Sequence, residues 1–120
     1  MNANEFRAEL QKIMPGYAWT VHKSRAEGYL DATGIQSSGF NRLSTLHVER
    51  REQGAPVEYT AKSAGYGRRA RWMHECSGGT LARALRGLQD YYERVAATHR
   101  THASYLANGR RAEPKEGGSK

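Results

Sequence analysis

The sequence predicts an α+β fold with an N-terminal helix, an antiparallel meander of four or five strands and a long C-terminal helix. Apolar residues recur with helical spacing near both ends of the chain and alternate with polar residues between them. The alternating runs are separated by short turns, which favour antiparallel neighbours. We therefore expect the apolar helix faces to pack on one face of the sheet, in a single domain over residues 1–109.

The first helix is indicated by an apolar stripe with offsets of four, seven and eight residues: Phe6, Leu10, Ile13 and Met14. Asn4 is a suitable N-cap, because its short side chain can accept a hydrogen bond from a free backbone N–H. Pro15 and Gly16 then stop the helix.

Strand patterns follow at residues 17–22, 29–36, 40–51 and 57–64. In the third run, Leu46 and Val48 are predicted on one face, with Leu43, Thr45 and His47 on the other. Residues 72–76 form a fifth strand or the second arm of a bulged hairpin, and the pattern leaves both alternatives open.

The last helix is expected over residues 80–108, with Thr80 as N-cap and Gly109 as C-cap. Its apolar stripe has a period near 3.6 residues: Leu81, Leu85, Leu88, Tyr92, Val95, His99, His102 or Ala103, and Leu106. Such a helix spans roughly 43 Å, whereas an eight-residue strand spans about 27 Å. The overhanging residues are a candidate homodimer or partner surface: His99, His102, Tyr105 and Leu106.

Composition restricts the function classes. The formal net charge of +7 favours an anionic partner, which is nucleic acid, an acidic protein surface or anionic lipid, and the charge alone does not separate the three. The single cysteine, Cys76, excludes an internal disulfide and fits a cytoplasmic protein. No apolar run approaches the ~20 residues of a membrane span, so we expect no membrane partner. Residues 110–120 are basic and lack apolar side chains, which predicts a disordered tail.

The strongest functional signal is the segment of residues 65–72, between the fourth strand and the last helix. It combines Arg68, Arg69 and Arg71 with Tyr66 and Trp72. Arginine is a planar, permanently charged donor suited to phosphate, and the aromatic rings offer faces on which bases stack. Further basic residues on neighbouring strands are expected to add to this surface: Arg42, Arg50, Arg51 and Lys62. A hairpin tip that is charged only for solubility is the competing interpretation.

Metal binding and catalysis have weaker support. His99 and His102 lie three residues apart on a helix, and His74 with Cys76 offers further ligand types, but no third or fourth ligand is spaced to complete a zinc site. His74 and Cys76 lack the local geometry of an activated nucleophile, and a free, buried cysteine is the commoner interpretation. We therefore expect no catalytic residues, no metal and no cofactor.

The sequence thus predicts a small nucleic-acid-binding module that contacts phosphates of DNA or RNA through its arginine and aromatic residues. The alternative is an inhibitor or adaptor of the phage or mobile-element type, similar to anti-CRISPR proteins in size and style. Such a protein would place its basic surface on an acidic host protein or a ribonucleoprotein complex. No family motif is matched by residues 65–67, because the aromatic pair that follows in RNA-recognition motifs is replaced by Arg68 and Arg69.

Overall fold

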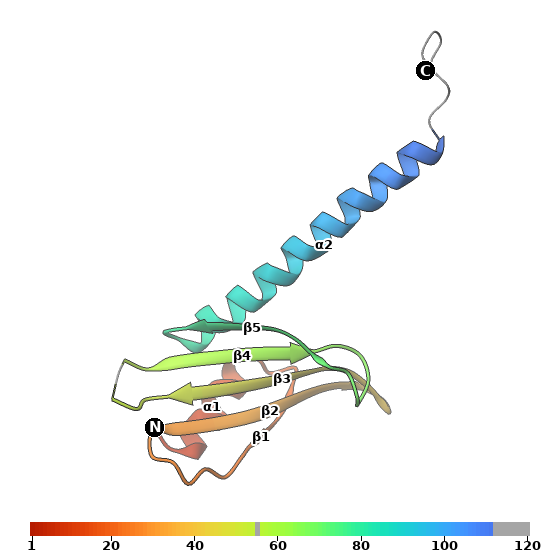
Figure 1. Cartoon of the computed structure of the whole chain (residues 1–120). Helices are drawn as coiled ribbons and strands as arrows, with labels where there is room; N and C mark the ends of the chain where they lie inside the picture. The colour runs from red at the N-terminus through yellow and green to blue at the C-terminus, as the bar shows by residue number, and fades with distance from the viewer. Residues whose placement is uncertain (55, 112–120) are drawn as a thin grey trace. The chain divides into compact units, whose positions relative to one another are not determined.

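The computed structural model of the chain describes residues 1–54 and 56–111. Its elements are α1 (Ala3–Ile13), β1 (Ala18–Val21), β2 (Tyr29–Ser38), β3 (Asn41–Arg51), β4 (Glu58–Ala64), β5 (Trp72–Gly78) and α2 (Leu81–Arg111). The strands form one sheet in the order β1-β2-β3-β4-β5, and each neighbouring pair is antiparallel (Figure 1). The predicted α+β meander is confirmed, and residues 72–78 form a full fifth strand.

The helix ends follow the capping rules with two differences from the prediction. Asn2 caps α1 in place of Asn4, because its side chain accepts a hydrogen bond from the Glu5 N–H at 2.8 Å and the Glu5 carboxylate accepts one from the Asn2 N–H. Thr80 caps α2 as predicted, its Oγ1 accepting from the Arg83 N–H at 3.1 Å. Gly109 does not end α2, which continues to Arg111.

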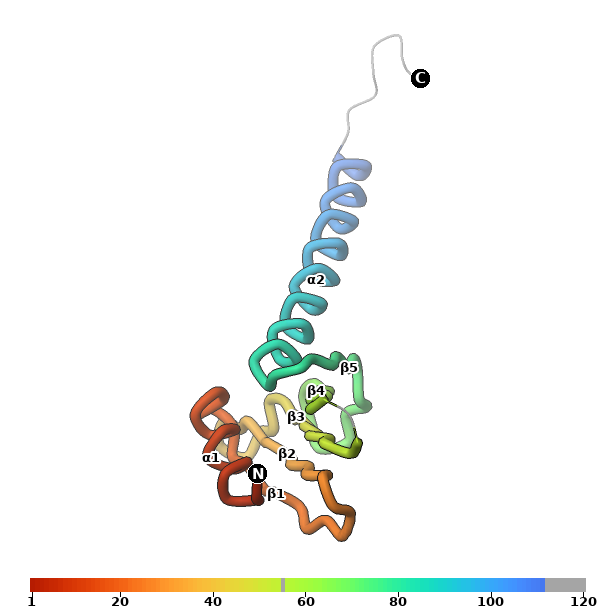
Figure 2. Tube along the Cα trace, turned by 90° about the vertical axis from the view of Figure 1, so that its left-hand side faces the viewer, coloured from red at the N-terminus to blue at the C-terminus, as the bar shows by residue number. Residues whose placement is uncertain are grey.

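One face of the sheet carries the core. Ala32, Val48 and Ala61 are partners across β2, β3 and β4, and all three are completely buried. Both helices add buried side chains to this layer: Phe6, Leu10, Leu81, Ala84 and Leu88. The predicted division of β3 is confirmed by the register for four residues, since Leu46 and Val48 share the core face and Thr45 and His47 lie on the other face. Figure 2 shows α1 on one side of the strands.

Hydrogen bonds and close contacts fix the helices on the core face. The Tyr59 hydroxyl on β4 donates to the Glu9 carboxylate on α1 at 2.9 Å. Cys76 of β5 packs against Gly87 of α2 so closely that a Cβ at residue 87 would lie 2.4 Å from the cysteine sulfur. The side chain of the only cysteine is therefore part of the helix–sheet contact.

The chain divides into two compact units, residues 1–88 and 89–120. The first unit includes the sheet, α1 and the beginning of α2 as far as Leu88. The described part of the second unit is the remainder of α2, where four predicted surface residues are exposed: His99, His102, Tyr105 and Leu106. Of the tail predicted over residues 110–120, Arg110 and Arg111 are helical, and residues 112–120 lie outside the described chain.

Among the described residues, no helix is both long enough and apolar enough to cross a membrane.

Candidate nucleic-acid interface

The arginine-rich segment is the loop between β4 and β5. Gly67 has a φ of +98°, a backbone conformation that glycine adopts without strain, and its N–H donates to the Arg42 carbonyl at 2.9 Å. The Tyr66 hydroxyl donates to the Asn41 side chain at 3.0 Å. Both bonds hold the loop against the beginning of β3, next to the turn that joins β2 to β3. We call these two joined segments, residues 39–43 and 65–73, the arginine end of the sheet.

The arginine end has no Asp or Glu among its residues. It has four guanidinium groups: Arg42, Arg68, Arg69 and Arg71. Arg68, Arg69 and Arg71 are exposed. Within residues 1–54 and 56–111, none of the four makes an ion pair with Asp or Glu. Their charge is therefore not neutralised by the described protein and is available to an anionic ligand.

Two β-bulges shape this end of the sheet. The pairing of β2 with β3 moves from Ser44 to Arg42 and leaves Leu43 without a partner. The pairing of β4 with β5 moves in the same way past Met73. Each bulge leaves its extra residue exposed, at 40% for Leu43 and 62% for Met73. Bulges redirect side chains and recur beside functional sites. Here the two bulges turn Leu43 and Met73 toward solvent at the same end of the sheet.

Exposed apolar side chains surround the arginines. Phe40 in the β2–β3 turn is fully exposed, and Tyr66 and Trp72 are exposed by 68% and 47%. With Leu43 and Met73 they make up five of the nine large apolar side chains that are exposed in the described chain. Phe40, Leu43 and Met73 were not predicted as site residues, because their exposure depends on a turn and two bulges that the strand pattern does not reveal.

Trp72 connects the loop to the sheet face opposite the core. The Lys62 ammonium of β4 lies 4.8 Å from the centroid of the Trp72 ring, a cation–π contact. The His47 ring on β3 meets the same indole edge-on, at 6.1 Å between centroids. Of the four basic strand residues that the sequence predicts for this surface, Arg42 and Lys62 lie beside the loop.

Arg50 and Arg51 lie elsewhere, at the end of β3 that is about 30 Å from Arg42. Arg50 is on the core face, where it donates to the Tyr59 hydroxyl at 3.0 Å and to the Glu52 carboxylate at 2.8 Å. Burial by itself would lower the pKa of Arg50, but these hydrogen bonds raise it above its ordinary value.

Arg51 is on the opposite face of the sheet from Arg50 and is neutralised there. It pairs with Glu49 at 2.9 Å and lies over the Tyr29 ring. The structure therefore separates Arg50 and Arg51 from the arginine end. We call their region, with Glu49, Glu52 and Glu58, the paired end.

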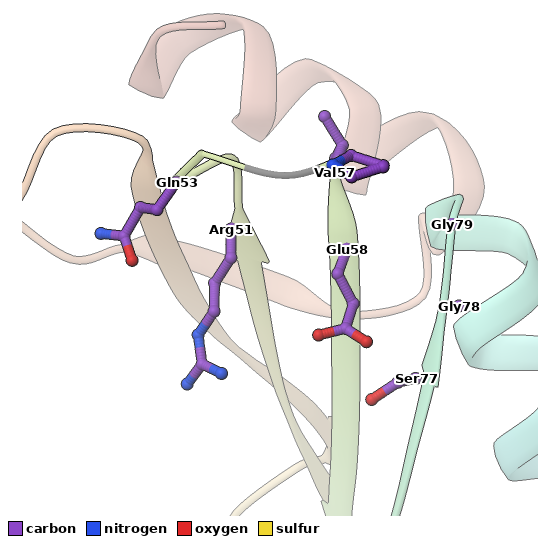
Figure 3. Close-up of a pocket in the computed structure, with 8 residues that line it drawn as sticks. Arg51, Gln53, Val57, Glu58, Ser77, Gly78 and Gly79 are labelled. Carbon is purple, nitrogen blue, oxygen red and sulfur yellow. The ribbon is translucent and has the colours of Figure 1, made fainter.

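A hollow at the paired end does not provide a second anion site. Its lining residues come from the ends of β3, β4 and β5 and from the connections that join β3 to β4 and β5 to α2: Arg51, Gln53, Pro56, Val57, Glu58, Ser77, Gly78 and Gly79. Figure 3 shows the Arg51 and Glu58 side chains extending from adjacent strands on the same side of the sheet. The one cation in this lining is accompanied by a carboxylate, so the hollow has no net charge to attract phosphate.

The centre of the sheet face opposite the core carries carboxylates and histidines. His47 Nε2 lies 3.0 Å from Asp31 and its Nδ1 lies 4.0 Å from Glu49. His22 stacks on His47 at 6.4 Å and shares a hydrogen bond with Thr33. This cluster was not predicted, because only the strand register brings its residues together. Its carboxylates, Asp31 and Glu49, give the centre of this sheet face a negative character that the arginine end lacks.

The described residues contain no group of three or more ligands arranged to hold a metal ion. His74 and Cys76 are both on the core face, away from the exposed loop. Neither residue contributes to the arginine end.

The chain has no match among protein family models, curated proteins or solved structures. The arginine end nevertheless combines two chemical features. Planar cations that lack an internal partner lie among exposed aromatic rings, on a loop and a turn joined by hydrogen bonds.

Proposed function

We propose that the chain is a nucleic-acid-binding protein that holds single-stranded DNA or RNA at the arginine end. The observation that carries the proposal is the set of four guanidiniums without carboxylate partners among exposed Phe40, Tyr66 and Trp72. The arginines would bind phosphates, and the rings would stack on bases. The lone cysteine fits a cytoplasmic location.

The phosphate contacts set the expected salt dependence. If Arg42, Arg68, Arg69 and Arg71 each neutralise one phosphate of a single strand, the logarithm of affinity falls against the logarithm of salt with a slope of about −3. Binding of this kind tolerates many sequences, because phosphates carry no base identity.

The aromatic rings favour single strands over duplexes. Phe40 is in a turn and Tyr66 in a loop, and both present their rings to solvent. A ring can stack only on a base whose face is free, and in an intact duplex the bases cover one another. Stacking on an unpaired base contributes about 1–3 kcal/mol.

A second candidate is an acidic surface on a host protein or ribonucleoprotein complex, as for an inhibitor of host defence. Exposed Leu43 and Met73 favour it, because neither side chain can stack on a base as a ring does. Arginine, methionine and aromatic residues are also enriched in protein interfaces. This candidate uses the same surface and predicts a stoichiometric protein partner in place of general affinity for single strands.

We also propose that the protein binds without catalysis. Cys76, the strongest nucleophile type in the chain, lies against Gly87 in the helix–sheet contact. The arginine end has cations and rings but no carboxylate, histidine or thiol for proton transfer or nucleophilic attack.

The test is fluorescence anisotropy with labelled oligothymidylate, oligouridylate and a duplex of the same length, measured over a series of salt concentrations. We expect single strands to bind more tightly than the duplex. Arg68→Ala/Arg69→Ala should weaken binding to every single strand and reduce the salt slope by about 1.4, the value for two phosphates.

The matched control is Arg110→Ala/Arg111→Ala, which removes the same charge at the end of α2. This control should leave the salt slope almost unchanged. Equal effects of the two double variants would mean that net charge, and not the arginine end, governs binding. No binding to any oligonucleotide, together with capture of one acidic host protein in a fixed ratio, would favour the second candidate.

A further inference from the structure

The stripe along α2 has a regular spacing that goes beyond ordinary amphipathicity. Its positions are separated alternately by four and three residues: Leu81, Leu85, Leu88, Tyr92, Val95, His99, His102 and Leu106. The mean spacing of 3.5 residues is the heptad repeat of a left-handed coiled coil. Leu81 and Leu88 are buried in the sheet unit, whereas His99, His102 and Leu106 are exposed. We call the positions from Tyr92 to Leu106 the seam.

Charge is segregated with respect to the seam. The charged residues between positions 89 and 109 are Asp90, Glu93, Arg94 and Arg100, and none lies in the seam or at a flanking position. The flanking positions, which are the e and g sites of the heptad, are all uncharged: Gln89, Tyr91, Ala96, Thr98, Ala103 and Tyr105. When the charged residues lie outside the seam and its flanking positions, the pattern is that of a helix that buries its uncharged face.

The second unit contains no described element on which this face could pack, because residues 89–111 are a single helical segment. Two shallow hollows follow one another along it, the first lined by Val95, Thr98 and His99 among others and the next by Thr98, His102 and Tyr105. Arg94 also lines the first hollow, and Ala97 and Thr101 line the second, so both hollows lie beside the seam.

We propose that residues 89–111 form a two-stranded coiled coil with the same segment of a second copy of this chain. A facing helix must have the same 3.5-residue period, and a second copy supplies it automatically. The uncharged flanking positions allow two such faces to meet without repulsion between like charges.

The histidines make this dimer sensitive to acid. In parallel pairing, His99 and His102 face their counterparts, and in antiparallel pairing of the whole segment the repeat places His99 opposite His102. No Asp or Glu lies between residues 96 and 111, and the nearest cation is Arg100. A neutral imidazole can enter such a seam, whereas a protonated imidazole would place a charge there without a carboxylate on its own helix between residues 96 and 111.

Sedimentation velocity of the full chain over a range of concentrations tests the proposal. We expect a species of twice the 13.4 kDa monomer mass at neutral pH. Val95→Asp places a carboxylate in the seam and should leave a monomer. Its matched control, Ser104→Asp, places the same group on the opposite side of the helix, outside both hollows, and should dimerise like the unmodified chain.

Acidification to about pH 5.5 should weaken dimerisation at least 10-fold, and His99→Leu/His102→Leu should abolish that dependence. A chain that stays monomeric at about 200 μM and neutral pH would overturn the coiled coil, as would a Val95→Asp variant that dimerises normally. If the dimer persists unchanged at about pH 5.5, the histidines are not in its interface and the proposed seam is wrong. These outcomes do not depend on the arginine end, so the binding proposal is tested separately.

Discussion

The two ends of the sheet contain the same kinds of residue in different arrangements. Arg42, Arg68, Arg69 and Arg71 lie at the arginine end without a carboxylate, whereas Arg50 and Arg51 at the paired end are bonded to Glu52 and Glu49. Aromatic rings follow the same division. Tyr59 and Tyr29 at the paired end lie beside guanidiniums, and Phe40, Tyr66 and Trp72 at the arginine end are exposed.

The comparison shows that the number of arginines does not define a binding surface. An arginine that already donates to a carboxylate would have to break that bond before it could bind a phosphate in the same way. The arginine end has its guanidiniums without such partners, so ligand binding there displaces only water and counterions. The difference between the ends therefore lies in the partners available to each side chain.

The largest expected effect comes from reversing charge at the arginine end. Arg68→Glu/Arg69→Glu should lower affinity for a single-stranded oligonucleotide by about 100-fold at low salt, because two phosphate contacts become repulsive. Arg25→Glu/Arg51→Glu reverses the same charge elsewhere and should cost less than about 5-fold, since screening weakens distant charges. Comparable losses, measured by anisotropy, would remove the distinction between the ends.

Removing the exposed ring in the β2–β3 turn should give the next largest effect. Phe40 is fully exposed, so Phe40→Ala should leave thermal stability unchanged while lowering single-strand affinity by about 1–3 kcal/mol if it stacks on a base. Tyr105→Ala removes an exposed ring from α2 and provides the control. An unchanged affinity for Phe40→Ala would restrict base contacts to Tyr66 and Trp72.

The framework between the two ends can be tested through Gly34. The Trp19 ring lies over this glycine, and a Cβ at residue 34 would come within 2.8 Å of a ring carbon. The indole N–H donates to the Met14 carbonyl at 3.1 Å, which restricts the movement of the ring. We expect Gly34→Ala to destabilise the fold by about 1–3 kcal/mol in urea unfolding. Gly16→Ala is the matched control, because a Cβ at residue 16 would meet no atom within 4 Å. Gly39 is unsuitable as a control, because its φ of +61° would strain any other residue.

Releasing the Arg51 guanidinium from its carboxylate partner should slightly raise the affinity for single strands, whereas the substitutions at the arginine end lower it. Glu49→Gln removes the carboxylate that holds Arg51 at 2.9 Å. The released side chain should raise affinity for single strands by no more than about 3-fold, because a single exposed phosphate contact is weak in salt. A decrease in affinity would show that Glu49 supports binding in some other way.

The smallest effect concerns stability in acid. Hydrogen bonding to Arg50 and its charge lower the pKa of Glu52 below its ordinary value of 4.5. The contribution of Glu52 to stability is therefore present above about pH 4.5 and is lost as the pH falls through the lowered value. Glu52→Gln should make the fall in stability below that pH shallower, as followed by circular dichroism. Glu27→Gln, at an exposed position, should not alter the profile.

The local chemistry of the sequence was sufficient to predict the elements. The alternation of Leu46 and Val48 with Thr45 and His47 assigned the two faces of β3 correctly, because a strand has only two faces and one of them is buried. Thr80 was recognised as an N-cap for a similarly local reason. The glycine at 109 was misleading, since a preferred capping residue does not stop a helix when nothing forces the chain to turn.

The amino-acid sequence by itself determined the order of helices and strands, the positive charge and the grouping of arginines with Tyr66 and Trp72. Only the tertiary structure decided which arginines remain without partners, because ion pairing depends on strand register and on the face that each side chain occupies. It alone placed Arg50 against Tyr59 and Glu52, and revealed the bulges that expose Leu43 and Met73. The physical reason is that composition fixes how much charge a chain carries, whereas neutralisation requires contacts of a few ångströms between residues distant in sequence.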